Sequence, residues 1–156
     1  MPRKGRVKER EIGADLKYNS ELANKFINKL MLQGKRSIAE RIFYQALELA
    51  AQKLSVKPLE VLEKAIANVR PHLEVRSRRV GGATYQVPME VRDRRAIHLA
   101  LKWILGASRE KKGKPMLEKL SQELIASYNG EGAAIKKRDD MHKMAEANRA
   151  FAHYRW

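Results

Sequence analysis

Side chains that commonly carry catalysis are scattered along this chain. The four histidines are His72, His98, His142 and His153. They lack the spacing of a metal site, and cysteine is absent. We expect His98, inside an apolar stretch, to be a packed core histidine. The adjacent Asp139 and Asp140 point in different directions on a helix, so paired-carboxylate chemistry is not expected. The sequence therefore predicts no enzyme, no metal site and no cofactor.

Basic residues are the ones whose type and spacing do suggest chemistry. The chain has 33 Lys and Arg against 18 Asp and Glu, a formal charge of +15 and a pI of about 10.2. Lysine neutralises phosphate, and the planar guanidinium of arginine grips two phosphate oxygens. Positive charge gathers in residues 1–10 and around residues 70–95, while residues 41–69 are nearly balanced. This distribution favours one surface that binds a polyanion.

Length and composition set the class of protein. A chain of 156 residues fits a single domain, 1–156, and 44% hydrophobic residues can bury a core. No apolar run approaches the roughly 20 residues of a membrane span, and the basic start lacks the apolar core of a signal peptide. The absence of cysteine suits a reducing compartment. We therefore expect a cytoplasmic protein with no membrane partner and no small-molecule substrate.

The elements that must position the basic residues begin with a β-hairpin arm over residues 72–90. Two strand-like runs meet at Gly81-Gly82-Ala83. A two-residue Gly-Gly turn would pair Arg78 with Tyr85 and would mix charged and apolar side chains on each face. A three-residue loop pairs Ser77 with Val87 and separates the faces better, so we expect that register.

In the expected register, each face of the arm has its own chemistry. Val75, Val87 and Met89 would pack against the helices. Arg76 and Arg78 would lie on the other face, beside Thr84 and Gln86, ready to meet phosphates. Pro88 lacks an N–H, which indicates an edge strand or a free two-stranded arm.

The rest of the chain predicts helices. Together with the hairpin they predict a mainly α, six-helix bundle-like domain, with the hairpin protruding between the third and fourth helices. The first three expected helices run from Asn19 or Ser20 to a stop at Gly34, onward from a capping box at Ser37–Glu40, and from Pro58 to just before Pro71. The last three cover the buried stretch 96–105, the segment from Pro115 to Asn129–Gly130, and the segment from about Gly132 toward Trp156.

Three classes of function fit these features: an RNA-binding structural protein, a DNA-architectural protein with a basic β-arm, and an enzyme acting on RNA. Arms that enter the minor groove of DNA often carry an apolar wedge, and a Gly-Gly-Ala tip has none. The enzyme lacks an acid–base or nucleophile constellation. RNA binding is favoured, and DNA architecture is the alternative.

Three stretches resemble a known family: RSRRVGGATYQVPMEV at the hairpin, INKLMLQGKRSIAERIFYQAL near the start, and MAEANRAFAHYRW at the end. They are similar to bacterial ribosomal protein seven of the small subunit, in order and over the whole chain. The resemblance implies a structural constituent of the small ribosomal subunit. It further implies a primary binder of the 3′ major domain of 16S rRNA that nucleates assembly of the subunit head. It also implies a protein that is a monomer when free, lies near the exit-site tRNA and the messenger path, and contacts small-subunit proteins nine and eleven.

The resemblance also assigns contacts to residues of this chain. Residues 1–18 become a basic N-terminal extension. The expected rRNA contacts are Arg3, Lys4, Arg6, Lys8, Arg10, Lys35, Arg36, Arg76, Arg78, Arg79, Arg92, Arg94, Arg95, Lys112, Lys114, Lys136, Lys137 and Arg138. The residues expected to face tRNA or a neighbouring protein are Arg149, Tyr154 and Trp156.

Overall fold

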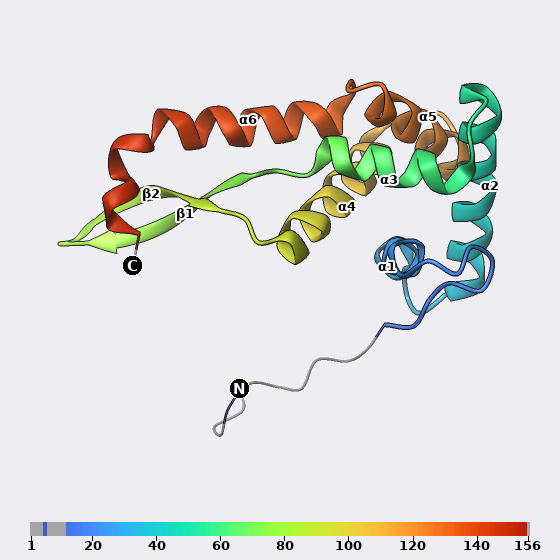
Figure 1. The fold of residues 1–156 in the computed structure, drawn as a ribbon, viewed down its shortest axis with the longest axis horizontal. Coiled ribbons are helices and arrows are strands. Elements are labelled where there is room, and N and C mark those ends of the chain that lie inside the picture. The colour runs from blue at the N-terminus through green and yellow to red at the C-terminus, as the bar shows by residue number, and fades with distance from the viewer. Residues whose placement is uncertain (1–4, 6–11, 156) are drawn as a thin grey trace.

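The structure is a computed structural model that describes residues 5 and 12–155. A helical body carries one long two-stranded arm, and α6 runs alongside that arm (Figure 1). The described elements, in chain order, are α1 (Glu21–Leu30), α2 (Arg36–Leu54), α3 (Pro58–Val69), β1 (Leu73–Val80), β2 (Ala83–Glu90), α4 (Asp93–Glu110), α5 (Met116–Tyr128), α6 (Ala133–Ala147) and the 3₁₀ helix η1 (Arg149–Tyr154). The predicted fold class is confirmed.

Local sequence explains most of the helix starts. The Ser20 hydroxyl caps α1 by accepting a hydrogen bond from the Ala23 N–H at 3.4 Å. Pro58 opens α3, and Pro115 precedes the first residue of α5. The capping box predicted at Ser37–Glu40 is wrong: α2 already begins at Arg36. The Glu40 carboxylate accepts a hydrogen bond from Arg36 Nε at 2.7 Å and is therefore engaged by the first residue of the helix.

Helix α1 ends earlier than its sequence suggests. Its last residue is Leu30, with Met31 as the C-cap, rather than a residue next to Gly34. Gly34 has a φ of 73° and lies in the turn between α1 and α2. A positive φ costs glycine little, so the glycine serves the turn rather than the helix end.

One hydrophobic core joins α1 to α6. Its largest fully buried apolar side chains are Phe26, Phe43, Ile27, Leu47, Leu62, Ile104, Leu120, Leu124, Val61 and Val69. Helix α4 contributes Leu101 and Ile104 to this core, as expected. The opposite face of α4 is exposed to solvent. His98 lies on that exposed face, so the prediction that it is packed in the core is wrong. The helical period places Arg94, His98 and Lys102 on one outer stripe, four residues apart.

The hairpin register differs from the expected one. Gly81 has a φ of 57° and Gly82 a φ of 91°, and they form a two-residue turn that pairs Val80 with Ala83. Positive φ at both central residues is the type I′ geometry, whose twist matches that of the flanking strands. Arg78 therefore pairs with Tyr85, and Arg76 pairs with Val87.

This register reassigns the two faces of the arm. Arg76 and Arg78 share a face with the fully buried Val87, so the prediction that they lie beside Thr84 and Gln86 is wrong. Arg79 occupies the polar face instead. On that face Ser77 and Gln86 exchange hydrogen bonds at 3.0 and 3.3 Å.

The chain ends in two helical pieces rather than one. Helix α6 stops at Ala147, and η1 turns back toward the arm (Figure 1). The Tyr85 ring on β2 lies 5.1 Å from the Phe151 ring and 5.2 Å from the Tyr154 ring, measured between centroids. An ion pair of 3.7 Å joins Arg155 to Glu90. The last residues therefore pack against the hairpin.

Candidate nucleic-acid interface

The foot of the arm holds a cluster of one carboxylate and two guanidinium groups. Glu74 is 5% exposed. Its Oε1 lies 2.6 Å from Arg76 Nη2, and its Oε2 lies 3.2 Å from Arg95 Nε at the start of α4. Burial alone would raise the pKa of the Glu74 carboxyl, but the hydrogen bonds and charges of Arg76 and Arg95 outweigh it and hold that pKa below its usual value of 4.5.

Both arginines of this cluster keep part of their surface free. Their side chains are 53% exposed for Arg76 and 49% exposed for Arg95. A guanidinium carries five N–H donors, so one that bonds Glu74 can still offer donors to a phosphate. Glu74 therefore holds two cations at fixed positions where the arm joins α4.

A groove between α1 and α4 continues this basic surface. It has a volume of about 330 Å³, with Ile97 and Leu101 among its apolar lining residues. The charged or titratable groups that line it are Lys25, Lys29, Arg94 and His98. Lys29 Nζ lies 3.2 Å from His98 Nε2. Burial, with the charges of Lys29, Arg95 and Lys102, holds the pKa of His98 below its usual 6.5. The lysine ammonium can only donate, so the ring nitrogen of His98 accepts in this contact.

A second hollow, of about 290 Å³, extends the groove toward α6. Lys29 lines both hollows, and the second adds Lys102, Arg109 and Lys137. Arg109 donates to the Leu30 carbonyl at 3.1 Å, and Lys137 forms an ion pair of 2.7 Å with Glu110. We call these two hollows together the α1–α4 face.

Sequence reasoning missed Lys25, Lys29 and Lys102. A signal was present, because Lys25 and Lys29 are four residues apart on one helix, as are Arg94, His98 and Lys102 on another. A search for runs of charge does not detect a stripe with helical spacing. The meeting of α1 with α4 is also a tertiary contact that neither segment encodes alone.

The structure places the predicted contacts in three groups. The first group is exposed and consists of Lys35, Arg79, Arg92, Arg94, Lys112, Lys114, Lys136 and Arg149. The second group is engaged in packing or in ties within the protein and consists of Arg36, Arg76, Arg95, Lys137, Arg138 and Tyr154, although Arg36, Arg76 and Arg95 are also exposed. Arg78 is half-buried. Arg36 bonds Glu40, Asn28 and Asn24, and Arg138 bonds the Asn68 carbonyl and Asp139. The predicted Arg3, Lys4, Arg6, Lys8, Arg10 and Trp156 lie outside the described residues.

The segment before α1 is fastened to the helical body. Asp15 is 3% exposed, accepts the backbone N–H groups of Lys17 and Tyr18, and accepts the Tyr44 hydroxyl from α2. Burial and the hydrogen bond with Asp15 raise the pKa of the Tyr44 phenol above its usual range. Ile12, at the start of this segment, lines the α1–α4 face. The basic residues 1–10 therefore precede a segment that is anchored next to that face.

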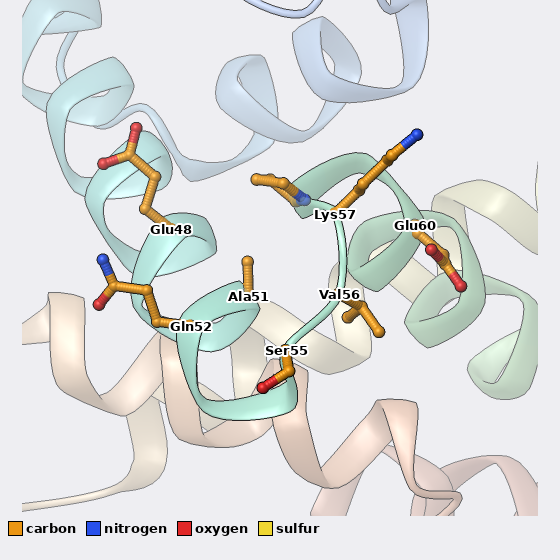
Figure 2. Close-up of a pocket in the computed structure, with 8 residues that line it drawn as sticks. Glu48, Ala51, Gln52, Ser55, Val56, Lys57 and Glu60 are labelled. Atoms are coloured by element: carbon orange, nitrogen blue, oxygen red, sulfur yellow. The ribbon is translucent and has the colours of Figure 1, made fainter.

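A larger hollow, of about 590 Å³, lies at the junction of α2 and α3. Figure 2 shows that Glu48, Lys57 and Glu60 point apart rather than toward a common centre. Glu48 is also paired with Lys17. The hollow therefore offers no converging acid and base. Among residues 12–155, moreover, no group of three His, Cys, Asp or Glu side chains could hold a metal ion.

Comparisons with known proteins agree with the basic surface. The family described as Ribosomal protein S7p/S5e matches residues 2–149. The chain is similar to the small ribosomal subunit protein uS7 of Dictyoglomus thermophilum, with 62% identity, and of Dictyoglomus turgidum, with 61%. The protein of the same name from Nitratidesulfovibrio vulgaris is 58% identical. Each match covers all 156 residues and the full length of the relative. In the described part of the chain no helix is both long and apolar enough to cross a membrane.

Proposed function

The chain belongs to the ribosomal protein S7p/S5e family, and from this premise we propose that it binds the 3′ major domain of 16S rRNA and nucleates assembly of the subunit head. As a member of this family it is a structural protein of the small ribosomal subunit and not an enzyme. This family membership takes the place of the alternative prediction, in which the chain is a DNA-architectural protein with a basic β-arm.

One observation carries the proposal. The first turn of α4 connects two basic areas, since Arg95 joins the Glu74 cluster at the foot of the arm and the adjacent Arg94 lines the α1–α4 face. The arm and the face are thus two basic areas that adjoin at the first turn of α4, where the charge of Arg95 also acts on His98 of the face. The α2–α3 side, by contrast, carries a near-balance of charges. Folded RNA presents phosphates along curved backbones and is recognised largely by shape, which suits an extended surface of fixed cations.

The far end of the arm, with η1, supports a second set of contacts. We propose that this end faces the exit-site tRNA and the messenger path, and that small-subunit proteins nine and eleven contact the neighbouring surface. Arg149 is exposed there and free to reach a partner. Tyr154 packs against Tyr85, so it would act by holding the arm and only secondarily by touching RNA.

The test is a binding comparison at one salt concentration. The native protein is titrated with transcripts of the 3′ major domain and the 5′ domain of 16S rRNA, and with duplex DNA of matched charge. Tighter binding to the 3′ major domain is expected, because shape complementarity adds to the shared electrostatic attraction. Equal affinities for the three would mean a nonspecific polyanion binder and would contradict the proposal.

A further inference from the structure

A histidine on α6 holds the foot of the arm. His142 Nε2 accepts the backbone N–H of His72 at 3.0 Å, and the two imidazole rings stack with centroids 6.0 Å apart and 22° between planes. His72 directly precedes β1, and its carbonyl accepts the Val91 N–H at 2.9 Å just beyond β2. His142 is therefore bonded to the residue at which both strands of the hairpin join the helical body.

We propose that His142 is a positioning residue for the arm: its neutral ring fastens the foot of the hairpin to α6, and its protonation releases that foot. The inference rests on the proposed function only where it concerns RNA, because the position of the arm can be measured on the free protein.

The chemistry follows from the direction of the hydrogen bond. A ring nitrogen that accepts an N–H carries no proton, and protonation would turn it into a donor that faces another donor. The His72 N–H would then lose its partner. The charged groups acting on His142 are Arg138 and Asp139 on α6 and His72 at the foot of β1. Arg138 and His72 oppose a positive ring, and Asp139 favours one.

The pH window follows from the same contacts. Burial, followed by the charges of Arg138 and His72, holds the pKa of His142 below its usual 6.5. Release of the foot removes the charge of His72 and the burial that the foot supplies, whereas Arg138 stays on α6 beside His142. The released state therefore binds the proton more readily. Docking of the foot is therefore strongest above pH 6.5 and weakens as the pH falls below it. The Glu74 cluster stays ionised in this window, because the pKa of Glu74 lies below 4.5.

The experiment measures where the arm points. The chain has no cysteine, so spin labels can be placed at Thr84→Cys on the arm and Gln52→Cys on α2, both exposed positions. The interlabel distance distribution is recorded at pH 7.5 and 5.5. In the otherwise native protein the displaced population should rise several-fold at pH 5.5, with about tenfold as the ceiling that proton linkage sets one pH unit below 6.5.

Three variants separate His142 from other causes. With His142→Ala the distribution should be wide at both pH values, while His142→Gln retains an acceptor without a titrating ring and should stay narrow at both. The control His153→Gln on η1 should respond to pH like the native protein. Circular dichroism at both pH values confirms that each variant is folded. The inference is overturned if the distance distribution of the native protein is the same at both pH values. It is also overturned if the distribution of His142→Ala or His142→Gln still changes with pH.

Affinity for the 3′ major domain is then measured at both pH values. A larger loss for the native protein than for His142→Gln extends the inference to RNA binding. If the arm moves with pH but both proteins bind RNA equally, the inference about the arm stands, and the proposed contact between arm and RNA is the part that fails.

Discussion

At the foot of the arm, Glu74 determines whether two arginines are held in place. Glu74 is 5% exposed, and its carboxylate is bonded to both Arg76 and Arg95. Glu74→Gln should lower the free energy of unfolding by about 1–3 kcal/mol, the usual range for losing a charged partner from a buried network. Urea denaturation at pH 7 measures this loss.

The pH dependence of the same substitution provides its control. Because the folded-state pKa of Glu74 lies below 4.5, the stability from its charge is present above pH 4.5 and is lost as the pH falls through the folded value. The difference between the native protein and Glu74→Gln should be constant above about pH 5.5 and should shrink in more acidic solution. A difference that grows on acidification would refute the assigned role.

Gly132 is a second residue whose local geometry predicts the effect of a substitution on stability. Its φ is 99°, and an added Cβ would lie 3.0 Å from Ala126 Cβ and 3.1 Å from Glu123 Oε1. Glu123 is buried, accepts the Ala134 N–H at the start of α6, and pairs with Lys111 at 2.7 Å. Gly132→Ala should therefore cost about 1–3 kcal/mol of unfolding free energy in thermal melts. Gly13→Ala, where nothing lies within 4 Å, is the control and should cost far less.

At the scale of elements, the register of the hairpin separates its arginines into two kinds. Arg79 lies exposed on the polar face, whereas Arg76 is bonded to the buried Glu74. Arg79→Ala should weaken rRNA binding and leave stability within about 0.5 kcal/mol of the native protein. Arg76→Ala should lower both, because it leaves Glu74 with one guanidinium. Equal stability of the two variants in urea titrations would contradict this division.

The same hairpin shows what sequence could and could not predict. Gly81-Gly82 between strand-like runs located the arm, and Pro58 and Pro115 located two helix starts. The register was missed because polar and apolar side chains were assumed to segregate. The fold instead neutralises Arg76 with Glu74 and uses Arg95 from α4 to complete the cluster. That partnership depends on a tertiary contact, as does the α1–α4 face.

At the scale of the whole molecule, the basic areas of the arm and the α1–α4 face contrast with a nearly balanced α2–α3 side. The most direct test compares two variants that lose the same charge: Lys29→Ala/Lys102→Ala on the α1–α4 face and Lys53→Ala/Lys57→Ala on the α2–α3 side. Affinity for the 3′ major domain is measured from about 50 to 200 mM salt, over which the native protein should lose roughly 10³–10⁵ if six to ten phosphates are bound. The face variant should bind more weakly and lower the slope of log K against log salt by about 2, because two phosphate contacts are gone, while the control keeps the native slope. Identical slopes and affinities for the two variants would contradict the assignment of the RNA-binding surface.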